Sequence, residues 1–391
     1  MRTDTRLAER LSKINPSSTL VITAKAKKLK SEGRDIVNFA AGEPDFDTPD
    51  FIKDAAVEAI KSGFTKYTPS TGIPELKKLI SDKFKRDNSL DYPPNQIVVS
   101  CGAKHSIYNT LMVLANRGDE VLIPSPYWVS YPEMVNLCEA KPVFIKTSPK
   151  NNFKIRADEL KAYIGLRTKL LILNSPSNPA GSVYTLNELK EIAEICAREK
   201  IYVISDEIYE KLIYDNCAHI SIASINEDIR QLTVTINGLS KSYSMTGWRI
   251  GYLCASREIT EAISKLQDHS TSNPASISQK AAVAALGTAD DFSRKVCAEF
   301  QKRRNYAISR LKNIKKIEPV IPKGAFYIFC DIAKTGMDSV AIANRLLEEA
   351  SVSLVPGEGF GWNNYVRISF ATGIEQLEKG FNRIQEWVKK L

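Results

Sequence analysis

The sequence predicts an α/β protein, with a large domain built on a mostly parallel seven-stranded sheet wrapped by helices and a smaller α+β domain. Three observations support this prediction. Apolar, β-branched runs alternate with helical patterns from about residue 95 to 260, which is typical of a parallel sheet covered by helices. The pattern is then helical to about residue 314 and mixed to the end of the chain. A length of 391 residues is typical of two domains.

Individual elements follow from these patterns. The helical patterns include Lys104–Asn116 and Leu186–Lys200, and Thr48 followed by Pro49 predicts a capped helix through Ile60. We expect an N-terminal arm and segment (1–45) packed on the small domain, a large domain (46–295) and a small C-terminal domain (296–391). The candidate strands are Ile97–Ser100, Glu120–Ile123, Val143–Lys146, Lys169–Leu173, Tyr202–Ser205, Leu232–Ile236 and Ile250–Cys254.

Composition excludes several classes of protein. Hydrophobic residues make up 43% and charged residues 25% of the chain, which is ordinary for a globular protein. No apolar run is long enough for a membrane span, and Met1–Pro16 lacks the apolar region of a secretory signal. The net charge of +9 is dispersed, and its densest group, Lys312 to Lys316, indicates a solvated helical face rather than a nucleic-acid site. A positive field would favour acidic substrates.

The cysteines and histidines predict neither a disulfide framework nor a metal centre. The seven cysteines are odd in number, and the closest pair, Cys196 and Cys217, is too far apart for a metal-binding knuckle. Only three histidines are present. We therefore expect no metal and a location in the reducing cytoplasm.

Lys241 is the leading candidate for a catalytic residue. It follows the apolar run Leu232–Ile236, and Ser240 and Arg249 lie nearby in the sequence. A desolvated lysine has a lowered pKa and can form a Schiff base with an aldehyde, whereas an arbitrary lysine is more often a surface residue. The hydroxyl and the guanidinium could bind a phosphate dianion.

Asp206 follows the apolar run Tyr202–Ile204 and precedes Glu207. A buried carboxylate at this position could keep the ring nitrogen of a cofactor protonated. A helix N-cap and a magnesium-binding acidic pair are the competing interpretations, although the chain has no G-x-x-x-x-G-K-[ST] loop. Lysine, aspartate and arginine at one edge of a parallel sheet together suggest pyridoxal 5'-phosphate.

Several further residues could complete such a site. Gly102, in the strand-to-helix turn Ser100–Lys104, would let a phosphate approach backbone N–H groups. Asn178, in a loop of turn formers, and Tyr209 could each donate to a phenolate oxygen, or could be ordinary loop and helix residues.

Two more residues have both a functional and a structural interpretation. Trp128 could stack on a flat ring or belong to the core. Arg367 lies in an alternating apolar run, where a buried guanidinium needs a carboxylate, either from a substrate or from an internal ion pair.

Taken together, these motifs resemble the class I aminotransferases, the pyridoxal-phosphate enzymes of the aspartate aminotransferase group. The resemblance covers nearly the whole chain and is similar to the bacterial branch that includes aspartate/prephenate aminotransferases. The matching segments are Ala41–Phe46, Tyr67–Gly72, Ser125–Trp128, Asn174–Gly181, Ser205–Tyr209, Ser240–Gly251 and Val366–Ser369.

This resemblance implies a homodimer with the aspartate aminotransferase fold and assigns roles to the site residues. Lys241 would be the Schiff-base lysine and proton shuttle, and Asp206 would pair with the pyridinium. The remaining cofactor-binding residues would be Gly102, Ala103, Lys104, Trp128, Asn178, Tyr209, Ser240, Arg249 and Tyr67 of the partner subunit. Arg367 would take the substrate α-carboxylate, with Gly42, Trp128 and Asn178 close by.

One departure concerns substrate specificity. Animal and enteric aspartate enzymes use an arginine for the side-chain carboxylate, and its motif is not found here. In the bacterial branch a lysine and a threonine take that role, and they match Lys104 and Thr19. The implied reaction passes the amino group of L-aspartate or L-glutamate to 2-oxoglutarate or oxaloacetate, with prephenate as a further candidate acceptor.

Three alternatives stay open at this point. The same cofactor could serve an aminotransferase of aromatic or other amino acids, or a C–S β-lyase, because fold and cofactor do not determine the reaction. A cofactor-sensing regulator would need a DNA-binding module, and the residues before Gly42 are too few for one. We therefore expect amino-acid and keto-acid partners and neither nucleic acid nor a membrane.

Overall fold

The computed structural model describes residues 7–16, 18–288 and 290–391. Its main element is a seven-stranded sheet, and each predicted strand is confirmed with its ends within two residues of the prediction. In spatial order the strands are β2 (Ile97–Ser100), β8 (Gly251–Cys254), β7 (Thr233–Gly238), β6 (Tyr202–Asp206), β5 (Thr168–Asn174), β3 (Glu120–Ser125) and β4 (Lys141–Lys146).

Five neighbouring strands, β7, β6, β5, β3 and β4, are parallel, and β8 runs antiparallel to both β2 and β7. The register places Asn174 beside Asp206, and Asp206 beside Ile236. The carboxyl ends of β5, β6 and β7 therefore meet at one edge, which is where parallel sheets form their sites.

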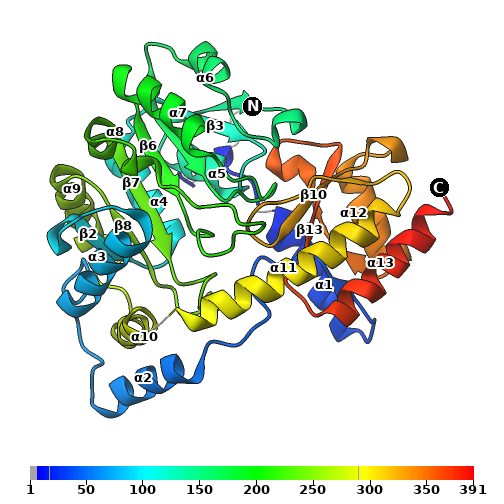
Figure 1. Ribbon diagram of the computed structural model, residues 1–391, viewed down its shortest axis with the longest axis horizontal. Coiled ribbons are helices and arrows are strands. Elements are labelled where there is room, and N and C mark those ends of the chain that lie inside the picture. Colours follow the sequence, from blue (N-terminus) through cyan, green and yellow to red (C-terminus); the bar gives the residue numbers. More distant parts are fainter. Residues whose placement is uncertain (1–6, 17, 289) are drawn as a thin grey trace.

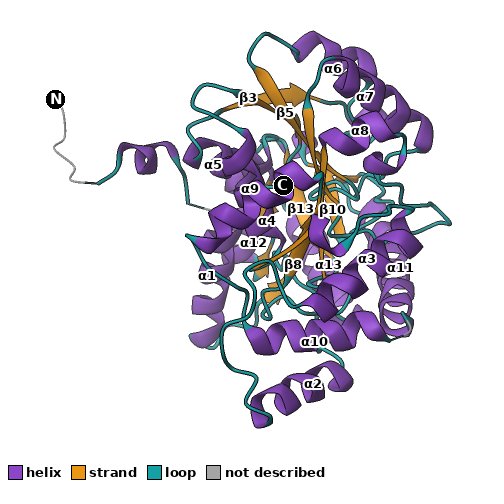
Figure 2. Ribbon diagram, turned by 90° about the vertical axis from the view of Figure 1, so that its left-hand side faces the viewer, coloured by secondary structure: helices purple, strands orange, loops and turns teal. Residues whose placement is uncertain are grey.

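Helices cover both faces of this sheet (Figure 2). One face packs against α4 (Ala103–Leu114), α5 (Ser130–Leu137) and α9 (Arg257–Asp268). The other packs against α6 (Ala157–Tyr163), α7 (Leu186–Arg198) and α8 (Glu227–Leu232), and near β2 and β8 against α2 (Asp50–Lys61), α3 (Pro74–Asn88) and α10 (Ser276–Gly287). Both predicted helices between strands are confirmed as α4 and α7.

The predicted cap of α2 is wrong. The helix begins at Asp50, and Pro49 rather than Thr48 occupies the N-cap position, with no side-chain cap. The hydroxyl of Thr48 instead donates to the carbonyl of Ser244 at 2.7 Å and accepts from the indole of Trp248 at 2.9 Å. The hydroxyl that was predicted to cap the helix is therefore used in tertiary hydrogen bonds instead.

A second, antiparallel sheet lies toward the C-terminus. Its order is β12 (Val355–Pro356), β13 (Tyr365–Ser369), β10 (Tyr327–Asp331) and β9 (Glu318–Pro319). It packs with α12 (Ser339–Glu349), α13 (Ile374–Val388) and α11 (Asp291–Lys312), which runs from the end near α10 toward α13 (Figure 1). The predicted domain boundary at 295/296 falls inside α11, and the division into domains stays a prediction.

The N-terminal segment lies against these C-terminal elements. Strand β1 (Val37–Asn38) pairs in parallel with β11 (Val352–Ser353), and α1 (Ser18–Ser31) contributes Ala26 to a cluster with Ile36 and Leu347. This anchoring fixes the following loop, so that the carbonyl of Ala40 lies 3.1 Å from a guanidinium nitrogen of Arg367.

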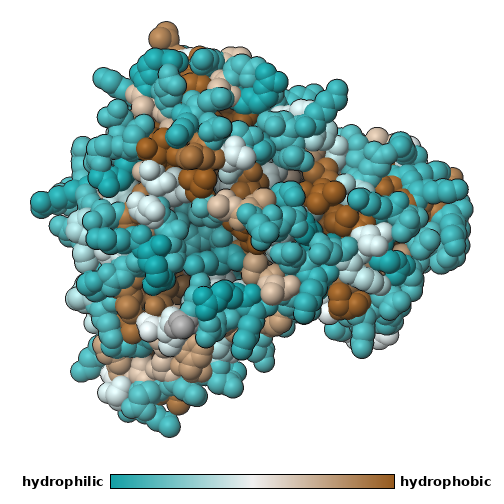
Figure 3. Space-filling view, in the orientation of Figure 1, coloured by the Kyte–Doolittle hydropathy of each residue, from teal (hydrophilic) through white to brown (hydrophobic). Residues whose placement is uncertain are grey.

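None of the helices in the described ranges is long and apolar enough to cross a membrane. The face shown in Figure 3 is mostly hydrophilic, with apolar residues in separate groups.

Candidate active site

The candidate site is a cavity of about 280 Å³ between the edge of the large sheet and the smaller one. The large-sheet side supplies residues that follow β2, β3, β5, β6 and β7, and the other side supplies Thr19, Gly42, Tyr327 and Arg367. Of the predicted residues, those lining the cavity are Thr19, Gly42, Ala103, Lys104, Trp128, Asn178, Asp206, Tyr209, Ser240, Lys241, Arg249 and Arg367.

Lys241 lies in the loop after β7 and projects into the cavity. Its Nζ donates to the carbonyl of Gly42 at 2.6 Å and lies 5.9 Å from the ring centres of Tyr209 and Phe326. Among the described residues it has no carboxylate partner within ion-pair distance. Burial lowers the pKa of Lys241 to about 8, so its amine loses its proton much more readily than that of an exposed lysine.

Asp206 is the last residue of β6 and is buried. Its Oδ2 accepts a hydrogen bond of 2.6 Å from Tyr131, and its Oδ1 accepts one of 3.3 Å from the N–H of Ile208. Burial raises the pKa of Asp206 to about 6. A carboxylate in this position favours a cation placed opposite it.

The two competing interpretations of Asp206 do not match this geometry. No α-helix starts directly after β6, so Asp206 does not cap one. Glu207 does not line the cavity, and its carboxylate is bonded to other side chains, so the two acidic residues do not face one site.

Arg367 lies on β13, is 1% exposed and has no acidic partner among the described residues. Its Nη1 donates to Oδ1 of Asn178 at 3.0 Å, and its Nε has no hydrogen-bond partner. Its guanidinium lies 4.2 Å from the ring centre of Tyr327. The residues that the structure describes therefore do not provide the internal ion pair considered from sequence, and a buried cation with a spare donor is suited to an incoming carboxylate.

One end of the cavity is suited to a phosphate. Gly102 has φ +90°, and a Cβ at this position would overlap the guanidinium of Arg249. That guanidinium donates to the carbonyls of Thr246 at 2.9 Å and Cys101 at 3.3 Å, beside the first turn of α4. A helix start whose N–H groups lack intrahelical partners, next to an arginine, is a typical anion site. Ser240 adds a buried hydroxyl.

Lys104 lies in the same first turn, with its Nζ 4.8 Å from the ring centre of Trp128. Burial, and after it the charge of Arg249, lowers the pKa of Lys104. Trp128 meets the ring of Tyr131 edge-on at 5.3 Å. Thr19, on α1, lines the same cavity.

Two predicted residues do not line this cavity. Gly102 lies directly behind it, where it makes room for Arg249. Tyr67 is 91% exposed, so within one chain it takes no part in the site. Its predicted role in a partner subunit stays a prediction.

Sequence reasoning missed two buried tyrosines. Tyr131 lies one helical turn after Trp128, a spacing that could have revealed it. Tyr327 shares a 3.0 Å hydrogen bond with Tyr209, but its strand is apolar up to the last residue, Asp331, and so signals only core at this position. Burial raises the pKa of Tyr209 well above its usual value, so its hydroxyl remains a donor.

Comparisons with known proteins agree with this geometry. The family model described as aminotransferase class I and II matches residues 34–384. The aspartate aminotransferase of Bacillus sp. (strain YM-2) is 48% identical over 388 residues, covering 98% of this chain and 99% of the relative. The probable aspartate/prephenate aminotransferase of Rickettsia conorii is 47% identical, covering 98% of each chain.

A solved structure agrees as well. The aspartate aminotransferase of Rhizobium meliloti superposes with a TM-score of 0.95 at 39% identity, covering 99% of this chain and 100% of that one.

Proposed function

This chain belongs to the class I and II aminotransferases, and on that premise we propose that it uses pyridoxal 5'-phosphate to transfer the amino group of L-aspartate or L-glutamate to 2-oxoglutarate or oxaloacetate. The observation that carries the proposal is one cavity in which a lysine of lowered pKa, a buried aspartate and an unpaired buried arginine converge.

The residues present fit the proposed cofactor. Arg249, the start of α4 and Ser240 would hold its phosphate, because Gly102 leaves room for the guanidinium beside the helix N–H groups. Asp206 would hold its pyridinium nitrogen, and Trp128 would lie against its ring. When bound, the cofactor supplies an aldehyde that bonds to amines and a ring that accepts electrons.

The chain's own residues account for substrate binding and proton transfer. The N–H groups of Arg367 that are not bonded to Asn178 or to Ala40 would bind the α-carboxylate of the amino acid. Nζ of Lys241, neutral above a pKa of about 8, takes the proton from the substrate α-carbon and delivers it on. Asn178 and Tyr209 would hold the groups around the ring, and Gly42 and Tyr327 form part of the cavity wall.

Lys104 and Thr19 support the preference for a dicarboxylic substrate. No acidic side chain of the described residues pairs with Lys104, so its ammonium is available at the cavity wall. Prephenate is a second candidate acceptor, because the relative in Rickettsia conorii carries that name and prephenate also has a second carboxylate.

We further propose a cytoplasmic homodimer in which Tyr67 of each subunit reaches the partner's cavity. The strong exposure of Tyr67 supports its role at the partner's cavity. The seven free cysteines fit a reducing compartment such as the cytoplasm. Sedimentation of the purified protein tests the dimer. A monomer that is fully active would contradict it.

The experiment that tests the function uses purified protein and a panel of amino donors and keto acids. We expect the highest kcat/KM with aspartate or glutamate paired with 2-oxoglutarate or oxaloacetate, and no activity in Lys241→Ala. Borohydride treatment should add the cofactor's mass to the peptide that contains Lys241. Release of pyruvate and ammonia from cysteine, without transfer to any keto acid, would instead establish a lyase.

A further inference from the structure

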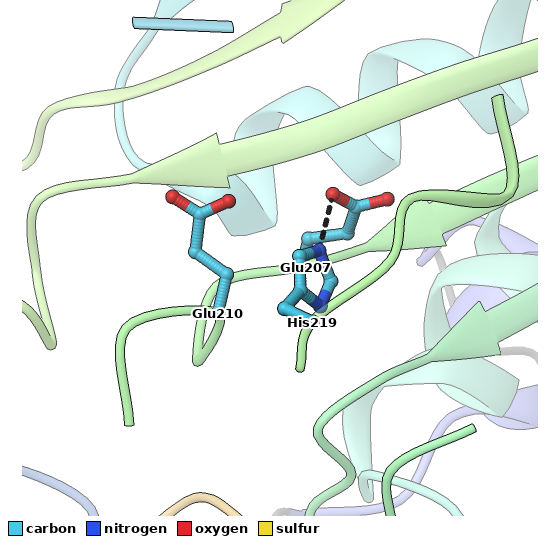
Figure 4. A group of neighbouring side chains, drawn as sticks. All are labelled: Glu207, Glu210 and His219. Atoms are coloured by element: carbon cyan, nitrogen blue, oxygen red, sulfur yellow. Dashed lines mark hydrogen bonds and ion pairs between the residues drawn. The ribbon is translucent and has the colours of Figure 1, made fainter. Parts of the chain in front are cut away.

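A buried cluster of ionisable side chains lies behind Asp206, on the side away from the cavity. Glu207 and Glu210 belong to the turn after β6, Lys83 comes from α3, and His219 comes from the loop that follows the turn. Their side chains are between 1% and 8% exposed. Figure 4 shows the ring of His219 beside Glu207, with one nitrogen directed to its carboxylate, and Glu210 to the left of this pair.

The carboxylate of Glu207 is fully satisfied by hydrogen bonds. Its Oε1 accepts from Ser205 at 2.8 Å and from Ser221 at 2.7 Å. Its Oε2 pairs with Nε2 of His219 at 2.8 Å and accepts from Asn88 at 3.3 Å. These four partners come from the end of β6, from α3 and from the loop that holds His219 and Ser221, and together they restrict the position of the side chain.

The cluster is balanced in charge when His219 is protonated. Lys83 forms an ion pair with Oε1 of Glu210, and His219 pairs with Glu207. Burial alone would lower the pKa of His219, but the charge of Glu207 and their hydrogen bond raise it above its usual value. Two glutamates and a histidine also have the chemistry of metal ligands, but Glu210 already pairs with Lys83 and both oxygens of Glu207 already have side-chain partners, so we infer no metal.

The turn after β6 divides its side chains between two sides. Asp206 and Tyr209 line the cavity, whereas Glu207 and Glu210 point into the cluster. The turn is held to the sheet by the N–H of Glu207, which donates to Ile236 at 2.9 Å, and closed by the N–H of Glu210, which donates to the carbonyl of Glu207 at 2.9 Å. The contacts that hold Glu207 and Glu210 in the cluster therefore also fix the positions of Asp206 and Tyr209 at the cavity.

We propose that Glu207 is a positioning residue, with His219 as its charged partner, and that the buried ion cluster holds the turn that presents Asp206 and Tyr209 to the cofactor. This inference rests on the proposed function, because only a bound cofactor makes the placement of those two side chains matter. Glu207 touches neither cofactor nor substrate and acts through its neighbour.

The first test is Glu207→Gln, which keeps the size of the side chain but removes the negative charge that pairs with His219. We expect the Kd for pyridoxal 5'-phosphate, measured by absorbance titration, to rise about ten-fold or more, since hydrogen bonds to charged groups are lost. We expect kcat to fall more than KM, and the circular dichroism of the bound cofactor to change. The matched control is Glu188→Gln, which breaks a partly buried pair with Lys154 that does not contact the turn.

The control variant Glu188→Gln should lower the unfolding temperature but leave the Kd within about two-fold of the wild-type value. The circular dichroism of its bound cofactor should be unchanged. If Glu207→Gln behaves like Glu188→Gln, with only stability reduced, the cluster is merely structural and the proposal is overturned.

A second variant keeps the proposal testable if Glu207→Gln does not fold. His219→Gln retains a donor for Glu207 but removes the charge, which the wild type loses as pH rises through the raised pKa of His219. The groups that face His219 are Glu207, Glu210 and Lys83. We expect weaker cofactor binding than wild type at low pH and equal binding at high pH. Identical pH profiles in the two proteins would overturn the proposal.

These outcomes separate the two proposals. If wild-type protein neither binds the cofactor nor transfers an amino group, the proposed function fails. If wild-type protein does both and the two variants match it, only the positioning role fails.

Discussion

Tyr131 donates a 2.6 Å hydrogen bond to Oδ2 of Asp206, and both side chains line the cavity. Burial favours the neutral form of Asp206, whereas this hydrogen bond favours the carboxylate. The hydrogen bond from Tyr131 therefore offsets part of the cost of burying the charged form of Asp206, the carboxylate that faces the proposed cofactor.

Removing the hydroxyl of Tyr131 should make the ionised form of Asp206 less favourable. In Tyr131→Phe we expect the pKa of Asp206 to rise, the Kd for pyridoxal 5'-phosphate to increase about ten-fold and kcat to decrease similarly. Absorbance titration and steady-state kinetics check this. Tyr184→Phe, which removes another buried hydroxyl that bonds only to the N–H of Ile155, should leave cofactor binding unchanged. Equal effects from both variants would count against a specific role for Tyr131.

Asp206 should destabilise the cofactor-free protein at neutral pH. Its pKa in the folded protein, about 6, exceeds the usual 3.8, so the folded state binds the proton more tightly and its stability falls as pH rises from about 4 to 6. The difference corresponds to about 3 kcal/mol. We expect cofactor-free Asp206→Asn to unfold at a higher temperature than wild type at pH 7 and at a similar one at pH 4, although it is inactive. Thermal unfolding measured at several pH values checks this prediction. A gain in unfolding temperature that is the same at pH 4 and at pH 7 would contradict it.

Arg367 should serve binding at the expense of stability. Because the guanidinium is buried without an acidic partner, Arg367→Met should leave the unfolding temperature of the cofactor-free protein unchanged or raised. Arg367→Lys should lower kcat/KM by about a hundred-fold for every amino donor, since a lysine cannot make the paired contacts to a carboxylate. The control is Arg383→Lys, which alters an exposed pair with Asp35. A loss confined to aspartate would contradict this assignment.

Lys104 should distinguish acidic from neutral substrates. In Lys104→Met we expect kcat/KM for aspartate to fall about ten- to a hundred-fold while that for alanine changes little, because one charge-assisted hydrogen bond is lost. Lys141→Met, at an exposed ion pair on β4, serves as the control. Equal losses for aspartate and alanine would show that Lys104 does not bind the distal carboxylate.

The positions of the strands along the chain and the mostly parallel character of the sheet were predictable, because apolar β-branched runs alternating with helical patterns are local signals. The order of the strands in the sheet, and which strand runs antiparallel, were not predicted. Nothing in the run Ile250–Cys254 shows that β8 runs antiparallel to its two neighbours, β2 and β7. The direction of a strand depends on where the connecting chain crosses the sheet. The cap of α2 failed for a related reason, because Thr48 bonds to Ser244 and Trp248, nearly two hundred residues away in sequence.

The candidate site shows the same division. Lys241, Asp206 and Arg367 could be selected from sequence, since each places a charged group in or after an apolar run, where desolvation demands a function or a partner. Tyr327 could not, because an aromatic residue in an apolar segment predicts core whether or not its hydroxyl has a role. For Tyr131 the only sequence signal was its spacing from Trp128, and its bond to Asp206 came from the structure. The resemblance of ordered motifs to a known family supplied the remaining assignments.

By itself the sequence determined the fold class, the strands and the chemical identity of the main site residues, because these depend on local periodicity and on residue type. Only the tertiary structure decided that Arg367 has no ion-pair partner among the described residues, that Tyr131 holds Asp206, and that Glu207 points away from the cavity into a cluster of buried polar groups. Such facts concern which buried polar groups find partners, and those partners come from segments far apart in the chain.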